Sequence, residues 1–170
     1  MKRSHLFSAL ALATVLVGAV ACESESPTEA LAPTPVFTIS GSGSSSILSC
    51  SAVEEPDTTI RTVGSDGGTI EVGRHRLYIP AGALTSNVRI TAREIAGPYR
   101  EVDFQPQGLV FSRPVTLKLS YDGCDRPMAL QKVVYLNETG GLVPQASFDD
   151  DSDEWVFASL QHFSQYAVAW

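Results

Sequence analysis

The chain has 170 residues, of which 44% are hydrophobic and 18% are charged, and its formal net charge is −7. This length leaves room for one domain of ordinary size, and the hydrophobic content argues against global disorder. An acidic chain without a basic stripe is repelled by phosphate backbones, so we expect no nucleic acid among its partners.

The first 22 residues have the pattern of an export signal. Lys2 and Arg3 make the N-terminus positive, and the apolar run 6–21 that follows is too short to span a bilayer comfortably. No basic flank follows this run, which ends in the small residues Gly-Ala-Val-Ala directly before Cys22.

These residues resemble the lipobox of bacterial lipoproteins, in which the cysteine thiol is acylated and becomes the mature N-terminus. Ala19 departs from the pattern, which prefers leucine at that position. The resemblance implies a signal peptide over residues 1–21 and a membrane anchor on Cys22. Glu23 favours delivery to the outer membrane or cell surface. The alternative is an ordinary signal peptide cut after Ala21, which leaves Cys22 as a free thiol.

Residues 22–57 have the composition of a flexible tether. They are rich in Ser, Pro, Gly and Glu, and their apolar runs are short, as in Val36-Phe37 and Ile47-Leu48. Such a segment buries too little apolar surface to offset the entropy lost on ordering. We therefore expect the folded domain to cover residues 58–170.

Within residues 58–170 the hydrophobic residues alternate with polar ones. The alternation is clearest over 87–93 and 115–121, and turns rich in Gly, Pro and Asp separate the alternating runs. No stretch after the signal sustains a helical stripe. Many short strands at regular spacing predict an all-β fold, a β-sandwich of mostly antiparallel strands.

Three stretches of this region form a recognisable series. They are Gly67-Gly68-Thr69, the run LYIPAGAL over 77–84, and the run FQPQGLVF over 104–111 before Pro114-Val115. In this order they resemble the ZU-five domain, a module of netrin receptors, zonula occludens proteins and ankyrins. The resemblance covers residues 58–170. It implies a β-sandwich that serves as a non-catalytic interaction or scaffolding domain with an unidentified protein partner and no cofactor.

The triplet His162-Phe163-Ser164 is the candidate for chemistry. Some ZU-five domains cut their own backbone between the Phe and Ser of such a triplet. The resemblance implies that Ser164 attacks the Phe163 carbonyl while His162 acts as base, at most a single-turnover autoproteolysis. On a regular strand His162 and Ser164 share a face, but the reaction also needs backbone strain. The alternative is a closing strand whose His and Ser make ordinary hydrogen bonds.

Cys50 and Cys124 are the cysteines that remain if Cys22 is acylated, and an even pair suits an oxidising compartment. Cys124 follows the strand that ends at Tyr121, in a loop able to reach Cys50. We therefore expect these two cysteines to form a disulfide.

We expect no metal site. The folded part has only His75 and His162 as histidines, and no paired-cysteine spacing suggests zinc. The acidic run 149–154 lacks the central glycine and the distal glutamate of a calcium loop. We interpret this run as a solvated hairpin loop.

Overall fold

The computed structural model describes residues 45–170, which form eleven strands and no helix. The strands are β1 (Thr58–Val63), β2 (Gly68–Val72), β3 (His75–Ile79), β4 (Val88–Glu94), β5 (Glu101–Gln105), β6 (Val110–Ser120), β7 (Lys132–Leu136), β8 (Leu142–Pro144), β9 (Ser147–Asp150), β10 (Trp155–His162) and β11 (Gln165–Ala169).

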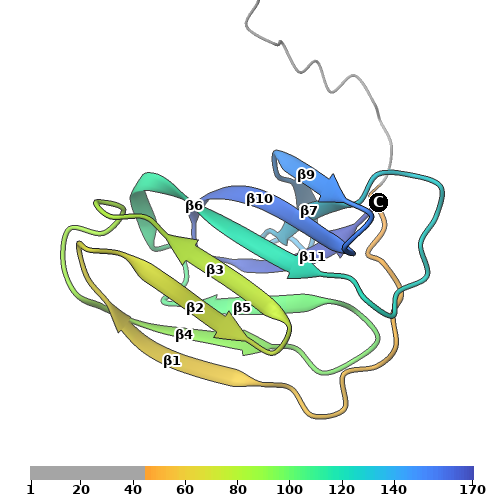
Figure 1. The fold of residues 1–170 in the computed structure, drawn as a ribbon, viewed down its shortest axis with the longest axis horizontal. Helices are drawn as coiled ribbons and strands as arrows, with labels where there is room; N and C mark the ends of the chain where they lie inside the picture. The colour runs from red at the N-terminus through yellow and green to blue at the C-terminus, as the bar shows by residue number, and fades with distance from the viewer. Residues whose placement is uncertain (1–44) are drawn as a thin grey trace, which may run out of the picture. The chain divides into compact units, whose positions relative to one another are not determined.

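The strands form two antiparallel sheets that pack against each other (Figure 1). One sheet has six strands in the order β1-β4-β5-β11-β7-β8, and the other has five in the order β2-β3-β6-β10-β9. The all-β sandwich predicted from the alternation of the sequence is confirmed.

Alternating side chains of the central strands fill the space between the sheets. In β6, Val115, Leu117 and Leu119 are fully buried, whereas Thr116 and Lys118 between them face outward. This follows from strand geometry, in which successive side chains point to opposite faces. The opposite sheet contributes Ile90, Ala92, Val102, Phe104, Tyr166 and Val168 to the same core. Burial of a large apolar side chain stabilises the fold by about 1.5–3 kcal/mol.

Side chains close the two open sides of the sandwich. On one side, the Thr59 hydroxyl of β1 donates a hydrogen bond to the Glu71 carbonyl oxygen of β2 at 2.7 Å. On the other side, the Ser147 hydroxyl oxygen of β9 accepts a hydrogen bond from the Val133 N–H of β7 at 2.9 Å. These contacts satisfy edge groups that could otherwise pair with a foreign strand.

The folded region begins earlier than the sequence predicts. Leu48 is fully buried in the core, and its N–H donates to the Val168 carbonyl oxygen at 2.9 Å. Ile47 forms a bridge to Ala169 at the end of β11. The predicted tether boundary at residue 57 is therefore wrong for 45–57. Leu48 and backbone hydrogen bonds to segments distant in sequence order this segment without a long apolar run.

The signal peptide over 1–21, the acylation site Cys22 and the tether up to residue 44 lie outside the described residues, so they stay predictions. Among residues 45–170, the structure contains no helix with the length and apolar character needed to cross a membrane.

Candidate functional site

The triplet His162-Phe163-Ser164 lies where the chain passes from one sheet to the other. β10 ends at His162 in the five-stranded sheet, and β11 begins at Gln165 in the six-stranded sheet. The pairing of β10 with β6 also shifts register between Leu160 and His162. The expectation that His162 and Ser164 share one face of a regular strand is wrong, because the strand ends between them.

Phe163 anchors this crossing in the core. Its side chain is only 1% exposed, its ring stacks on Phe104 with centroids 5.1 Å apart, and it meets Phe111 edge-on at 4.9 Å. Aromatic pairs of this kind contribute about 0.5–1.5 kcal/mol beyond burial of area. The Phe163 N–H donates to the Leu109 carbonyl oxygen at 2.9 Å. The Phe163–Ser164 peptide is thus held by both its side chain and its backbone.

The carbonyl oxygen of Phe163 has two polar neighbours. It accepts a hydrogen bond from the Gly108 N–H at 3.0 Å, and the His162 Nδ1 lies 3.2 Å away. A proton on Nδ1 would make His162 a second donor. Two donors on one carbonyl oxygen stabilise the oxyanion that forms when a nucleophile attacks the carbonyl carbon. This is the feature of the triplet that favours acyl chemistry.

The Ser164 hydroxyl is engaged elsewhere. It is buried and donates to the Leu136 carbonyl oxygen at 3.4 Å. Within the described residues no hydrogen bond joins Ser164 to the His162 imidazole, and neither Phe163 nor Ser164 has a positive φ. A general base must lie within about 2.6–3.2 Å of the hydroxyl oxygen whose proton it takes, so this arrangement differs from the one in which His162 could activate Ser164.

An open groove of about 730 Å³ borders the triplet, and the β7–β8 hairpin lines its other side. The His162 ring meets Tyr135 edge-on at 5.1 Å, and the Tyr166 hydroxyl donates to the His162 carbonyl oxygen at 2.6 Å. Burial, with a smaller contribution from Tyr135, raises the pKa of Tyr166. The groove gives water a route to the Phe163–Ser164 peptide.

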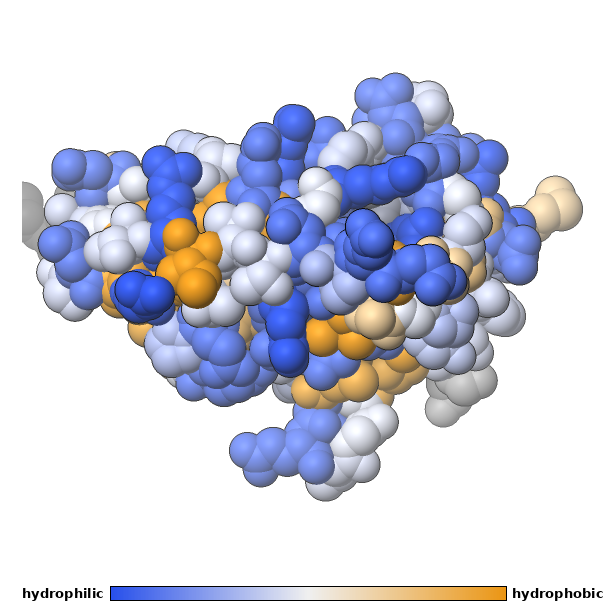
Figure 2. Space-filling view, turned by 90° about the horizontal axis from the view of Figure 1, so that it is seen from below, coloured by the Kyte–Doolittle hydropathy of each residue, from blue (hydrophilic) through white to orange (hydrophobic). Residues whose placement is uncertain are grey.

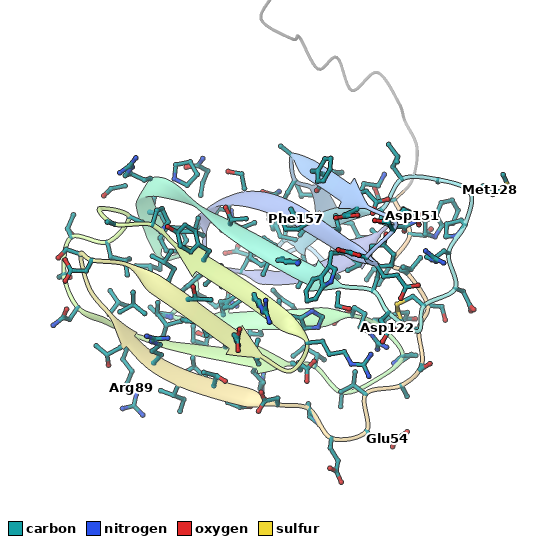
Figure 3. The ribbon with its side chains drawn as sticks, viewed as in Figure 1. Glu54, Arg89, Asp122, Met128, Asp151 and Phe157 are labelled. Atoms are coloured by element: carbon teal, nitrogen blue, oxygen red, sulfur yellow. A yellow bond between two sulfur atoms is a disulfide. The ribbon has the colours of Figure 1, made fainter. Side chains whose placement is uncertain are left out.

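Cys50 and Cys124 form a disulfide with an S–S distance of 2.00 Å (Figure 3). The bond joins the segment before β1 to the loop after β6. Backbone hydrogen bonds flank it, since the Cys50 N–H donates to the Pro98 carbonyl oxygen at 2.8 Å and the Ser51 N–H donates to the Gly123 carbonyl oxygen at 2.9 Å. The structure joins the two cysteines that the sequence analysis pairs.

A buried polar cluster near the disulfide was missed by sequence reasoning. His75 is 1% exposed, its Nδ1 accepts a hydrogen bond from the Ser120 N–H at 3.2 Å, and its Nε2 lies 3.5 Å from a Glu94 carboxylate oxygen. Because Nδ1 is the acceptor, Nε2 carries the ring proton. Burial, followed by the charges of Arg100 and Arg74, lowers the pKa of His75 to about 4.

Arg100 connects the N-terminal segment to this cluster. Its guanidinium donates to the carbonyl oxygens of Ser51 and Asp122, both at 2.8 Å. A signal for the cluster is present in the sequence, because His75 alternates in phase with the buried Leu77. A polar residue in the inward phase of a strand needs a buried partner.

Only residues 151–154 of the acidic run form the turn between β9 and β10, because Asp149 and Asp150 are the last residues of β9 and pair with β10. The expectation that the whole run 149–154 is a hairpin loop is therefore wrong for these two residues. Asp149 accepts a hydrogen bond from the Tyr121 hydroxyl at 2.8 Å, and Asp151 pairs with Arg126 at 2.8 Å. Over residues 45–170 no three His, Cys, Asp or Glu side chains gather where they could hold a metal ion. The carboxylates of Asp149 and Asp151 instead contact Tyr121, just after β6, and Arg126 in the loop that follows.

The three motifs that resemble the ZU-five domain lie at turns and close contacts. Gly67 has a φ of 75°, and a Cβ there would lie 2.2 Å from the Ile79 carbonyl oxygen, so the first motif packs on the second. The Gly82 N–H donates to the Ser65 carbonyl oxygen at 2.8 Å. In the third motif, Gly108 provides the N–H that contacts Phe163.

Comparison of the chain with protein-family models and with curated proteins finds no match. The ZU-five assignment therefore rests on the three motifs and stays a proposal.

A row of side chains crosses the outer face of the five-stranded sheet, one from each strand, and forms a second candidate site. In sheet order the row is Glu71, Arg76, Lys118, Phe157 and Phe148. Arg76 pairs with Glu71 at 3.0 Å, the Lys118 Nζ lies 5.0 Å from the Phe157 ring centroid, and the rings of Phe157 and Phe148 are 6.1 Å apart. We call these five side chains the cross-sheet row. Figure 3 shows Phe157 on this layer of the sandwich.

Proposed function

We propose that this chain is an exported, lipid-anchored envelope protein whose β-sandwich is a non-catalytic binding module of the ZU-five type. The cross-sheet row is the observation that carries this proposal. Phe148 is 68% exposed, and Tyr78 on the same face is 54% exposed. Large aromatic side chains are enriched at binding surfaces, where they contribute most of the affinity. The residues before Cys22 support the lipid anchor.

The cross-sheet row suits binding better than catalysis. Its charged groups are already engaged, Arg76 with Glu71 and Lys118 with aromatic rings. No hydrogen-bonded nucleophile and base stand among the five side chains. Side chains that neighbours hold in place lose little conformational freedom when a ligand binds.

The surface seen in Figure 2 differs from an obligate protein interface. Its hydrophobic side chains form small patches separated by polar ones. Stable oligomer interfaces usually need larger continuous apolar areas. The side of the molecule that Figure 2 shows therefore lacks the continuous apolar area of an obligate interface.

Site-specific photo-crosslinking in growing cells tests the proposal. A photo-reactive phenylalanine analogue replaces Phe148 or Tyr78 in the full lipoprotein, and the matched control replaces Arg89, which is exposed on the outer face of β4. We expect light-dependent adducts from positions 148 and 78 and none from 89. No adduct at the first two positions, or equal adducts at all three, would contradict a binding face on the five-stranded sheet.

Self-processing between Phe163 and Ser164 is the second candidate, favoured by the two polar neighbours of the Phe163 carbonyl oxygen. In this reaction the Ser164 oxygen attacks the Phe163 carbonyl carbon, and its proton passes to His162. His162 returns this proton to the Ser164 nitrogen, which leaves as an amine, and water hydrolyses the resulting ester to a carboxylate at Phe163 and a free Ser164 hydroxyl. β11 pairs with β5 and β7 on its two sides, so a cut chain would keep its last strand.

A further inference from the structure

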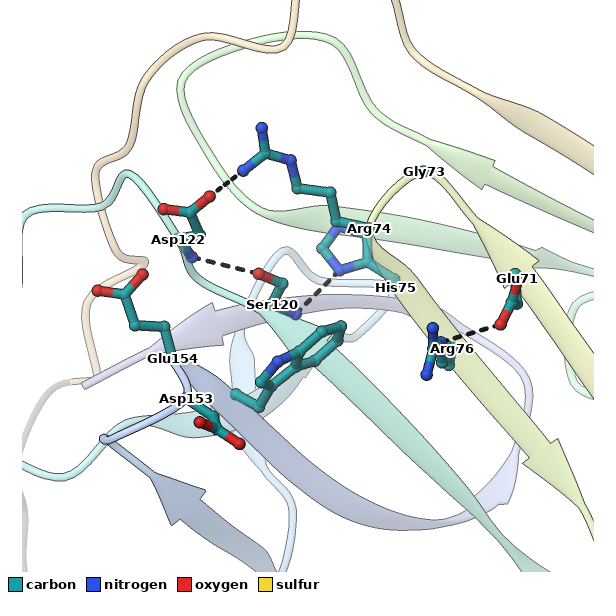
Figure 4. Close-up of a pocket in the computed structure, with 10 residues that line it drawn as sticks. Glu71, Gly73, Arg74, His75, Arg76, Ser120, Asp122, Asp153 and Glu154 are labelled. Atoms are coloured by element: carbon teal, nitrogen blue, oxygen red, sulfur yellow. Dashed lines mark hydrogen bonds and ion pairs between the residues drawn. The ribbon is translucent and has the colours of Figure 1, made fainter.

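A hollow of about 410 Å³ lies on the same face as the cross-sheet row (Figure 4). The turn between β2 and β3 forms one side of it, and the end of β6 and the turn before β10 form the other sides. The residues that line it and matter here are Glu71, Arg74, Arg76, Asp122, Asp153 and Trp155.

Trp155 provides the apolar wall of the hollow. It is the first residue of β10 and is partly buried, and the Lys118 Nζ lies 4.0 Å from its ring centroid. This cation–π contact holds the indole in place. The same indole lines the hollow, so apolar ring atoms stay open to a ligand. Glu71 and Arg76 line the hollow and also belong to the cross-sheet row, so the hollow and the row share these two side chains.

The rim of the hollow is polar, and three of its four carboxylates lie in ion pairs. Glu154 pairs with Arg126 at 3.5 Å, and the other two pair with the arginines of the rim. Arg74 forms an ion pair with Asp122, and Arg76 forms one with Glu71 at 3.0 Å. Figure 4 shows the first pair reaching toward each other beside Glu154. Each of these four side chains is more than half exposed. A guanidinium has five N–H donors and a carboxylate about four acceptor sites, so paired groups keep unused capacity.

This arrangement favours an uncharged ligand. An anionic ligand that approached either arginine would be repelled by the carboxylate paired with it, Asp122 or Glu71. A basic peptide that approached either carboxylate would be repelled by Arg74 or Arg76. A neutral ligand that both donates and accepts hydrogen bonds can use the free sites without breaking either pair.

We propose that the hollow binds a carbohydrate, with the C–H face of one sugar ring against Trp155 and its hydroxyls on the Arg74–Asp122 and Arg76–Glu71 pairs. A pyranose has the two required surfaces, an apolar ring face and a rim of hydroxyls that donate and accept. The row continues from Lys118 over Phe157 to Phe148, roughly 10 Å across two strand spacings. A surface of this length can contact more than one sugar ring of an oligosaccharide. The assignment rests on the proposed binding function and specifies its ligand.

Titration of saccharides into the full lipoprotein tests the assignment. The protein is purified in a detergent without a sugar head group, since such a head group would compete. The probes are the soluble hexasaccharides of β-1,4-glucose, α-1,4-glucose and β-1,4-N-acetylglucosamine, followed by calorimetry and tryptophan fluorescence. We expect at least one to bind, and Trp155→Ala and Asp122→Asn each to weaken binding by about tenfold or more.

The matched control is Trp170→Phe, which removes the tryptophan that follows β11 and should leave saccharide affinity unchanged. Trp155 is partly buried, so Trp155→Ala could unfold the protein. Asp122→Asn keeps the test valid in that case, because Asp122 is exposed and asparagine has the same shape as aspartate. No binding of any probe at millimolar concentration overturns the assignment, as does unchanged affinity in Asp122→Asn.

The crosslinking experiment separates this failure from failure of the proposed function. Adducts at positions 148 and 78 without saccharide binding would refute the carbohydrate but keep the binding module. Adducts in which mass spectrometry finds peptides of a second protein would identify a protein partner instead and refute the carbohydrate. The absence of both adducts and saccharide binding would refute both proposals.

Discussion

Among single residues, His75 combines nearly complete burial with an imidazole whose pKa is lowered to about 4. Its Nδ1 accepts the Ser120 N–H, and the nearest guanidinium charges belong to Arg100 and Arg74. Protonation would therefore remove an acceptor and place a positive charge among two others. The neutral ring is the form that the fold stabilises.

We expect His75 to make the protein less stable as the pH falls from about 7 towards 4. The pKa of His75 is about 4 in the folded protein and 6.5 without burial, so in this window the unfolded chain binds a proton that the folded chain does not. Linkage then removes up to about 3 kcal/mol from the free energy of unfolding. Urea unfolding at pH 7 and pH 4.5 measures the loss.

His75→Gln isolates this effect and should show a smaller loss over the same pH range. Glu101 acts in the opposite direction, because burial raises its pKa and the folded state then holds its proton more tightly. Glu101 is present in both proteins, so it does not affect the comparison. A loss in the variant as large as in wild type would show that other groups cause it.

The Ser164 hydroxyl has a separate test at this scale. Self-processing predicts a fragment from Ser164 to Trp170 in denaturing mass spectrometry after prolonged incubation at neutral pH. Ser164→Ala should abolish it, and Ser164→Cys should retain it, because a thiol can perform the same acyl shift. His162→Gln should slow the reaction by about 10²–10⁴-fold, the usual contribution of a general base. An intact mass for the wild-type protein would refute self-processing and leave the triplet with a structural role only, at the crossing between the sheets.

At the scale of elements, three kinds of contact hold the segment before β1 on the sandwich. Leu48 is buried in the core, Val53 forms a bridge to Gly97, and Cys50 is bonded to Cys124. Backbone hydrogen bonds to distant segments support it along its length, from the Ser46 N–H, which donates to Trp170, to the Asp57 carbonyl oxygen, which accepts from the Glu94 N–H.

We expect removal of the disulfide by Cys124→Ser to lower the free energy of unfolding by about 2–5 kcal/mol, because a long loop of the unfolded chain is no longer closed. Urea unfolding of wild type with and without reductant should show a loss of similar size. Cys22→Ser is the matched control and should leave the stability of the domain unchanged. Two free thiols from Cys50 and Cys124 in denatured, non-reduced protein would disprove the bond in solution.

At the scale of the whole molecule, the strongest sequence pattern lies outside the sandwich. Small residues precede Cys22, and the described domain starts after a segment rich in Ser, Pro and Gly. An acylated cysteine followed by such a segment would leave the sandwich free to turn both faces to its surroundings. This arrangement suits a module that binds through one outer sheet face.

We expect Cys22→Ser to move the protein from the membrane to the soluble fraction. Each buried methylene of an acyl chain contributes about 0.8 kcal/mol to membrane binding, so loss of the chains removes the anchor. Fractionation and intact-mass measurement follow the change, with Cys124→Ser as a control that should stay in the membrane. Retention of Cys22→Ser in the membrane, or a wild type without acyl mass, would refute the lipid anchor.

The sequence by itself determined the fold class and the faces of individual strands. In β6, the alternation of Val115, Leu117 and Leu119 with polar residues is a local property, since a strand places every second side chain on one face. The same reasoning locates turns at glycines such as Gly67. Both the faces of a strand and the position of a turn follow from the local sequence, without knowledge of what packs against them.

Only the tertiary structure decided which strands pair and where the chain changes sheets. β11 lies between β5 and β7, and His162 and Ser164 fall on either side of a crossing that no periodicity marks. Leu48 and His75 gain their partners from segments distant in sequence. Strand pairing and burial of single residues depend on how separated faces pack together, and local alternation shows only that a face is buried, not what buries it.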